Sequence, residues 1–197
     1  MKNHLCSVVL LYVVLIAGCA HPYVITPELS TIDRKDVNKI AKNVGYYISA
    51  EDRALEVITP GGGGDKVKYT PYKDAEPALQ KVLSNMFAQV HILKSLDNKQ
   101  FIISNQISFI FIPRIETTSL STSIITWPPT DFFLSLNCAA LDPAGKIVWE
   151  KKIVGRGHAE YSEFKNDFQL AAKRASFQVF TELQRELNTA SVFREKR

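Results

Sequence analysis

The chain has 197 residues, 22% of them charged, and a formal net charge of +4. This length fits one domain with a substantial hydrophobic core. Acidic and basic residues are interspersed along the chain, and so mild a positive balance does not indicate a nucleic-acid partner.

The first residues have the composition of a bacterial export signal. Lys2 and His4 make a short positive start, residues 5–16 are almost entirely apolar, and small residues follow before Cys19. A positive region, an apolar stretch of about 7–15 residues and small residues before a cleavage point are typical of a signal peptide. A membrane-spanning helix would need about 20 apolar residues. The sequence therefore predicts a signal peptide over residues 1–18, with a plain secretory signal and a chance cysteine as the alternative.

The end of this segment, Leu15-Ile16-Ala17-Gly18-Cys19, resembles the lipobox of bacterial lipoproteins. The resemblance implies cleavage before Cys19, a diacylglyceryl group on its sulfur and an acyl chain, such as palmitate, on its amine. Two or more acyl chains anchor a protein stably in a membrane. We expect no other cofactor. Because Ala20 rather than aspartate follows the cysteine, the resemblance also implies the periplasmic face of the outer membrane, if the host is Gram-negative.

The cysteines add one constraint. Cys6 leaves with the signal peptide and Cys19 becomes the anchor, so Cys138 is left alone and no intrachain disulfide is expected. Cys138 falls in an apolar segment, where a free cysteine behaves as a small hydrophobic residue. We therefore expect packing alone to hold the domain together.

The domain is expected to span residues 37–190. Residues 19–36 include two prolines and little periodicity, which predicts a lipidated tether. Residues 191–197 are predicted to form a frayed tail.

Strand-forming residues dominate the start of the domain. Val44–Ser49 is rich in them, and Leu55–Thr59 is a second short candidate strand. Pro60 and the run Gly61–Gly64 then interrupt the chain.

A helix follows the glycine run. Asp74 is its expected N-cap, and Pro77 lies in its first turn. Apolar residues recur at helical spacing on one face: Leu79, Val82, Leu83, Met86, Phe87 and Val90.

Three strands come next. Phe101–Ile115 is a long strand in which Pro113 marks an edge or an end. Phe132–Leu141 alternates apolar residues on one face. Asp142–Lys146 is a strong turn signal, and Ile147–Ala159 returns as the partner strand.

The last element is a long helix over Phe164–Asn188. Its apolar stripe is Phe164, Phe168, Ala172, Ala175, Val179, Leu183 and Leu187, and its alanines allow close packing. The order is strand, helix, strand meander, helix. It predicts a two-layer α+β domain, a mainly antiparallel sheet with two helices packed on one face.

This pattern resembles a group of small envelope lipoproteins. The group includes the lipoprotein of the lipopolysaccharide-assembly translocon, the auxiliary lipoproteins of ABC-type transport systems and the YajG-like lipoproteins. The resemblance rests on the lipobox, the order of elements, the hairpin Leu141–Trp149 and the alanine-rich final helix. It implies accessory work without chemistry, beside an envelope protein partner.

The glycine run has three interpretations. A phosphate-binding loop requires G-x-x-x-x-G-K-[ST] between a strand and a helix, and Gly61–Gly64 followed by Asp65-Lys66 does not match it. A flexible connector is the plainer interpretation. The third is a ligand-binding basic-aromatic loop that suits phosphorylated or acidic glycans and lipid headgroups: Lys66, Lys68, Tyr69, Tyr72 and Lys73.

Residues 117–130 carry no charge and are rich in serine and threonine. They are interpreted either as strand ends joined by a polar loop or as a contact surface. An uncharged strand pairs readily with another chain's edge, and tryptophan is a frequent interface anchor. The candidate partner-binding residues are Trp127, Ile124 and Ile125.

Polar clusters give little sign of catalysis or metal binding. The histidines are scattered and no cysteine or carboxylate completes a metal spacing. His158, Glu160 and Ser162 are close in sequence, but no G-x-S-x-G motif accompanies them, so we expect them to end a strand and cap the final helix. No metal, no catalytic residue and no enzyme activity are expected.

The sequence therefore predicts a non-catalytic, lipid-anchored accessory or structural component of an envelope transport or assembly complex. Its partners would be the membrane, through Cys19, and an envelope protein. The alternative is a periplasmic lipid- or glycan-binding carrier with a pocket between helices and sheet and the basic-aromatic loop at its mouth.

Overall fold

The computed structural model describes residues 20–32 and 39–195. The predicted signal peptide and Cys19 lie outside the described residues. In chain order the elements are β1 (Ala20–Pro22), η1 (Leu29–Thr31), β2 (Ile40–Tyr47), α2 (Ala50–Ala54), β3 (Val57–Pro60), β4 (Lys66–Tyr69), α3 (Pro71–Met86), β5 (Phe87–Leu93), α4 (Lys99–Ser104), β6 (Ile107–Leu120), β7 (Asp131–Leu141), β8 (Ile147–His158), α5 (Tyr161–Phe164), α6 (Leu170–Thr189) and η2 (Ser191–Phe193).

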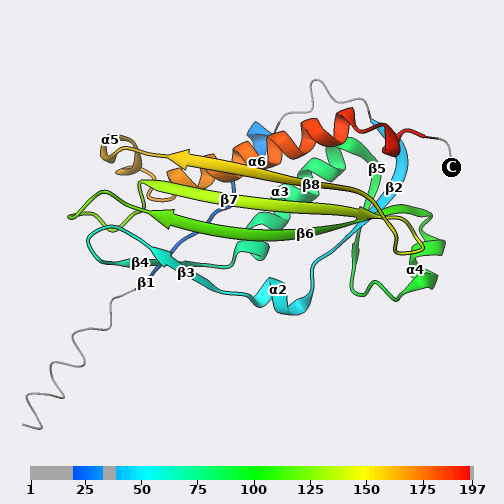
Figure 1. The fold of residues 1–197 in the computed structure, drawn as a ribbon, viewed down its shortest axis with the longest axis horizontal. Coiled ribbons are helices and arrows are strands. Elements are labelled where there is room, and N and C mark those ends of the chain that lie inside the picture. The colour runs from blue at the N-terminus through cyan, green and yellow to red at the C-terminus, as the bar shows by residue number, and fades with distance from the viewer. Residues whose placement is uncertain (1–19, 33–38, 196–197) are drawn as a thin grey trace, which may run out of the picture.

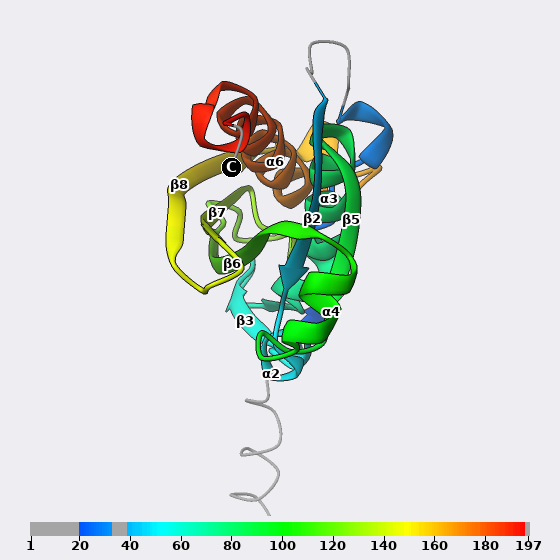
Figure 2. The same ribbon diagram turned by 90° about the vertical axis from the view of Figure 1, so that its right-hand side faces the viewer.

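The predicted α+β class and two-layer arrangement are confirmed. One layer is a five-stranded sheet in the order β5-β2-β6-β7-β8, and the other contains α3 and α6, which pack on each other (Figure 1). Helix α6 packs on β7 and β8, whereas α3 packs on β5 and β6 (Figure 2). A second sheet, β1-β4-β3, lies beside β6 through β3.

The five-stranded sheet is mixed, and its parallel part is not predicted from the sequence. β2 pairs in parallel with both β5 and β6, whereas β6, β7 and β8 form antiparallel ladders. The parallel half was missed because the chain returns to β2 through crossover segments that contain α3 and α4, and such long-range pairing leaves no local turn signal.

The hairpin of β7 and β8 is confirmed. The predicted inward face of β7 is completely buried: Phe132, Leu134, Leu136, Cys138 and Ala140. Each large apolar side chain buried in this way stabilises the fold by about 1.5–3 kcal/mol. Burial also raises the pKa of the Cys138 thiol to about 12, so the thiol stays protonated and acts as an apolar filler.

Helix α3 differs from the prediction at both ends. It begins at Pro71, with Thr70 as the N-cap, so that Asp74 lies in the first turn. It ends at Met86, and Phe87 and Val90 belong to β5. Aromatic and branched residues favour strands, and pairing of β5 with β2 decides the conformation of this segment.

The predicted strand over 101–115 also begins too early. Residues 99–104 form α4, where Asn98 Oδ1 accepts a hydrogen bond from Phe101 N (3.1 Å), and β6 starts only at Ile107. The interpretation of Pro113 is confirmed. The last pair between β2 and β6 is Tyr46 with Phe111, so Pro113 follows the point at which β6 loses its β2 neighbour.

The final helix is shorter than predicted. Residues 161–164 form the separate α5, Phe168 lies half exposed between the two helices, and α6 begins at Leu170. The close packing that its alanines suggested is present. A Cβ atom on Gly157 of β8 would come within 1.8 Å of the Ala171 carbonyl oxygen, so helix and strand are in backbone contact.

Both predicted flanking segments belong to the domain in their described parts, which corrects the tether over 19–36 and the tail over 191–197. Tyr23, Ile25 and Ile32 are buried in the main core. Phe193 is fully buried and lies 5.0 Å, centroid to centroid, from the Phe109 ring. The buried residues of these segments are single anchors at irregular spacing, so they produce no periodicity that sequence analysis detects.

Candidate functional site

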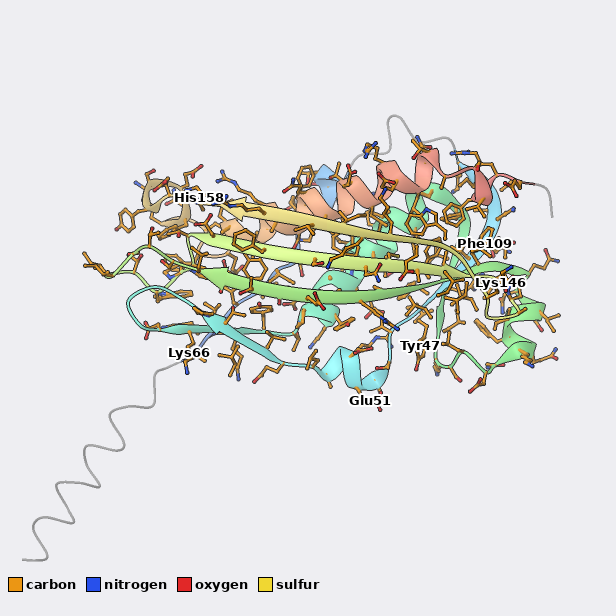
Figure 3. The ribbon with its side chains drawn as sticks, in the orientation of Figure 1. Tyr47, Glu51, Lys66, Phe109, Lys146 and His158 are labelled. Atoms are coloured by element: carbon orange, nitrogen blue, oxygen red, sulfur yellow. The ribbon has the colours of Figure 1, made fainter. Side chains whose placement is uncertain are left out.

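The two ends of the sheet differ in construction. We call one the loop end; it comprises β1, the turn Gly61–Gly64, the loop 121–130 and α5 (Figure 1, left). The far end comprises α4 and the turn Asp142–Lys146. Lys66 and His158 mark the loop end and Lys146 the far end in Figure 3. The described chain starts at the loop end, so the residues next to the predicted anchor lie there.

The turn Gly61–Gly64 is docked on the loop 121–130. Gly62 N donates a hydrogen bond to Trp127 O (2.8 Å), and Gly63 N donates one to Ser123 O (3.0 Å). A Cβ atom on Gly62 would lie 1.9 Å from Thr126 O, so only glycine allows this approach. The interpretation of the glycine run as a flexible connector is therefore wrong.

Hydroxyl groups of the loop hold its own backbone. Ser123 Oγ accepts hydrogen bonds from Ile125 N (3.3 Å), from Thr126 N (3.0 Å) and from Thr126 Oγ1 (2.7 Å). Thr130 Oγ1 accepts one from Thr122 N (3.4 Å). Residues 117–120 belong to β6 and pair with β7. Residues 121–130 are thus a closed loop, and residues 117–120 are the end of β6.

Trp127 fixes the loop to the N-terminal segment. Its ring stacks on His21 with centroids 4.4 Å apart and meets the edge of Phe168 at 5.2 Å. His21 Nε2 also lies 3.2 Å from Asp65 Oδ2. Trp127 is partly buried and packs against the core, so it holds the loop in place; its role in binding a partner stays a prediction.

The exposed residues of this loop are the two isoleucines. The side chains of Ile124 and Ile125 are 87% and 88% exposed at the tip. Phe168 and Tyr161 add exposed aromatic surface at the same end. Of the three predicted partner-binding residues, Ile124 and Ile125 are therefore free to make an outside contact.

The predicted basic-aromatic loop does not form. Lys66–Tyr69 is strand β4, and Lys68 pairs with Glu56 (3.2 Å). Tyr69 and Tyr72 are buried. Tyr69 donates a hydrogen bond to Thr117 Oγ1 (2.8 Å), and the Tyr72 hydroxyl accepts one from Ile115 N (3.2 Å).

The two tyrosines are therefore structural, and burial raises the pKa of Tyr69. Lys73 is exposed in α3, and Lys66 is exposed at the start of β4. The five residues do not converge on one ligand.

A cluster of charged side chains lies next to the loop 121–130 and is joined to it through Thr130. Arg156 donates two hydrogen bonds to Asp131 Oδ1 (2.8 and 3.2 Å), and His158 Nδ1 lies 3.1 Å from the same oxygen. His158 Nε2 lies 2.8 Å from Glu160 Oε1. Thr130 Oγ1 donates to Asp131 Oδ2 (3.2 Å) and thereby joins the cluster to the loop.

The titration of this cluster follows from these bonds. Burial works to raise the pKa of Asp131, but the hydrogen bonds from Arg156 and His158 outweigh it and the pKa is lowered. Hydrogen bonds to Glu160 and then to Asp131 raise the pKa of His158. The cluster is therefore a set of satisfied ion pairs, which favours a structural role over proton transfer.

The expectation that the polar residues around His158 and Glu160 end a strand and cap a helix is confirmed with one change. β8 ends at His158, and Glu160 caps a helix through a capping box with Glu163, but that helix is α5 and not the final helix. Within residues 20–32 and 39–195, no group of three or more metal-ligating side chains comes together. Over the same residues, no helix has both the length and the apolar character needed to cross a membrane.

Sequence reasoning missed the interlock between the glycine turn and the loop. Gly62 and Trp127 are joined by a hydrogen bond between backbone atoms. Every residue type has these atoms, so the sequence does not reveal such a contact. The one available signal was the glycine run itself, because four glycines between strands also fit a turn pressed against another chain segment.

No family model and no curated protein matches the chain. Among solved structures, the chain is similar to the PelC dodecamer of Paraburkholderia phytofirmans, at 11% identity and a TM-score of 0.50 over 78% of this chain and 91% of that one. It is also similar to a DUF330 family protein of Xanthomonas campestris, at 10% identity and a TM-score of 0.47 over 85% and 93%.

A Caulobacter crescentus protein provisionally described as a lipoprotein has a TM-score of 0.41 at 12% identity, over 78% of this chain and 93% of that one. Identities this low show a likeness of fold alone.

Proposed function

We propose that this protein is a non-catalytic, lipid-anchored accessory component of a bacterial envelope complex, held at the periplasmic face of the outer membrane through Cys19. The observation that carries the proposal is the position of Ala20. It pairs with Lys66 in the small sheet and is the residue that follows the lipobox cysteine. Anchor and folded domain are thus adjacent, with no spacer between them.

Because the anchor is adjacent to the domain, we expect the protein to act close to the membrane surface. Consecutive Cα atoms are about 3.8 Å apart, so acyl chains on Cys19 would hold the loop end at the lipid surface. A domain fixed in this way braces or positions a neighbouring envelope protein, because it lacks the reach that a long tether provides.

The interior of the domain also supports an accessory role over the carrier alternative. Leu79 and Leu83 of α3 and Val179 and Leu183 of α6 are buried in the core. Side chains therefore fill the place where a carrier of this fold would hold its ligand between helices and sheet, and the basic-aromatic mouth of that pocket does not form.

The anchor is tested by fractionation. In a Gram-negative host, the wild-type protein should be found in the outer-membrane fraction, and Cys19→Ser should move to the soluble periplasmic fraction or remain unprocessed. A Cys138→Ser variant is the matched control and should fractionate like the wild type. If Cys19→Ser changes neither the fraction nor the apparent mass, the lipoprotein assignment is wrong.

The accessory role is tested by crosslinking intact cells, purifying the acylated protein in mild detergent and identifying associated molecules by mass spectrometry. A reproducible near-equimolar envelope protein supports the proposal. An enriched lipid or glycan without a protein partner would contradict it and favour the carrier alternative.

A further inference from the structure

The loop 121–130 lies at the same end of the sheet as Ala20, the residue that follows the predicted anchor (Figure 1), which suggests a second contact with the membrane. We propose that Ile124 and Ile125 insert into the lipid surface beside the acyl chains, so that the protein contacts the bilayer both through its anchor and through this loop. This inference rests on the proposed function, because it requires a lipid anchor on Cys19.

A short series of contacts connects the anchor to the loop. Ala20, the residue after Cys19, pairs with Lys66 at the edge of β4. His21 stacks on Trp127 with ring centroids 4.4 Å apart, and Trp127 lies two residues after Ile125. The loop tip is therefore tied to the residues at which the acyl chains would enter the membrane.

The docked turn holds this loop in place. The hydrogen bonds from Gly62 N and Gly63 N fix it at two points, and the Ser123 hydroxyl binds the backbone across the tip. Internal hydrogen bonds matter here because an unpaired backbone group is costly to remove from water. The loop thus presents its apolar side chains with several polar groups already satisfied.

The chemistry of the tip suits a lipid surface. Ile124 and Ile125 are the most exposed large hydrophobic side chains of the described residues, and residues 117–130 carry no charge. Trp127 of the same loop contacts Phe168, and Tyr161 of α5 is exposed at the same end of the sheet. Tryptophan and tyrosine are enriched at membrane–water interfaces, where one part of the ring is apolar and the other is wet.

Lipid is the favoured occupant because of the anchor's position. The acyl chains would enter the bilayer immediately beside this loop, so a protein partner at the same place would have to separate the domain from its own membrane. Residues 117–120 also offer no open strand edge to another chain, because β7 pairs with them and β3 packs against β6, where Ser119 Oγ donates hydrogen bonds to Thr59 Oγ1 and to Pro60 O.

The test places a single tryptophan at the tip. Trp127 and Trp149 are the two tryptophans of the chain; in a Trp127→Phe, Trp149→Phe background, Ile125→Trp reports on the tip. Ile103→Trp is the matched control, because Ile103 is 69% exposed in α4 at the far end. The acylated proteins are reconstituted into phosphatidylethanolamine and phosphatidylglycerol vesicles with brominated acyl chains, which quench tryptophan in contact with them.

We expect fluorescence at position 125 to fall by at least half and fluorescence at position 103 to fall by less than a tenth. A second measurement uses native Trp127 in the Trp149→Phe protein, where we expect partial quenching that Ile124→Asp with Ile125→Asp reduces at least twofold. This second protein keeps the clamp on His21 and serves if the double phenylalanine background does not fold.

Two results would overturn the inference in different ways. If the protein floats with the vesicles but neither tryptophan is quenched, the anchor stands and insertion of the loop is wrong. If the protein does not float at all, the anchor itself is absent, and the proposed function fails together with the inference.

Discussion

Two turns of this protein both depend on glycine, but for different physical reasons. At the far end, Gly145 adopts a φ of +85° and no atom lies within 4 Å of where its Cβ would be. At the loop end, a Cβ on Gly62 would collide with Thr126 O. The first glycine is needed for its backbone conformation, and the second is needed because another segment occupies the space.

The difference shows what holds each end together. The turn at Gly145 is local: Asp142 N donates to Lys146 O (2.9 Å), and Asp142 Oδ1 accepts hydrogen bonds from the amides of Ala144 and Lys146. The turn Gly61–Gly64 has local bonds too, from Gly61 N to Asp65 O (2.9 Å) and from Asp65 N to Gly62 O (3.1 Å), but Gly62 N and Gly63 N also donate to a loop at least 60 residues later. The turn at the loop end is thus additionally held by a distant segment of the chain.

The largest loss of stability should come from a substitution in the core that both ends share. Leu83 of α3 is fully buried, so Leu83→Ala is expected to lower the free energy of unfolding by about 2–5 kcal/mol. Both turns should lose hydrogen-exchange protection together, because the loss acts on the whole domain. Urea denaturation gives the first quantity and amide exchange the second. An unchanged denaturation midpoint would exclude Leu83 from the core.

A smaller and local effect is expected from Gly62→Ala. The new Cβ collides with Thr126 O, and overpacking of this kind typically costs about 1–3 kcal/mol. Exchange protection should fall at Gly62 and Gly63 and remain unchanged at the turn near Gly145. Gly64→Ala is the matched control in the same turn: its φ of +84° costs about 1–2 kcal/mol through backbone conformation alone, since nothing lies within 4 Å of its Cβ position. Exchange protection at the Gly62 and Gly63 amides that falls as much in Gly64→Ala as in Gly62→Ala would contradict the role of the contact with Thr126 O.

The same contrast explains which parts of the fold are predictable from sequence. The β7–β8 hairpin is identified from its alternating apolar residues and the Asp142–Lys146 turn signal, both of which are local. The sequence predicts a helix for the start of β5 because Phe87 and Val90 continue the helical spacing of α3, and only pairing with β2 makes this segment a strand. The parallel half of the sheet and the buried terminal segments depend on partners distant in sequence.

The candidate site divides in the same way. The sequence indicates that residues 117–130 are uncharged and that Ile124 and Ile125 lie among them. It does not indicate that Trp127 turns inward onto His21, because that stacking joins residues more than 100 positions apart. Nor does the sequence indicate that Tyr69 and Tyr72 are buried while the lysines next to them in the sequence are not.

Gly145→Ala should have a moderate effect confined to the far end. A non-glycine residue in the left-handed region costs about 1–2 kcal/mol, and no steric collision adds to this cost. Gly145→Asn is the control, because asparagine tolerates that conformation and should lose less stability. Thermal unfolding of the two variants gives the comparison. Equal losses would mean that backbone conformation is not what requires glycine at this turn.

The smallest expected effect depends on pH and distinguishes the loop end from the far end. The pKa of His158 is raised, first by Glu160 and then by Asp131. Protonated His158 therefore stabilises the fold fully below its unfolded pKa of about 6.5, and this contribution is lost as the pH rises through the folded pKa. Because the side chain is about half exposed, the contribution is expected to be at most about 1 kcal/mol.

Chemical denaturation at several pH values isolates this contribution. The difference in free energy of unfolding between wild type and His158→Gln should be largest near pH 6 and should shrink toward pH 9. The lowered pKa of Asp131 keeps that carboxylate ionised throughout this window. Glu160→Gln removes the largest cause of the raised pKa and should reduce the dependence, whereas Gly145→Ala should leave it intact. A difference that grows with pH would mean that neutral His158 is the stabilising form, and the ion pairs with Asp131 and Glu160 would then not support the loop end.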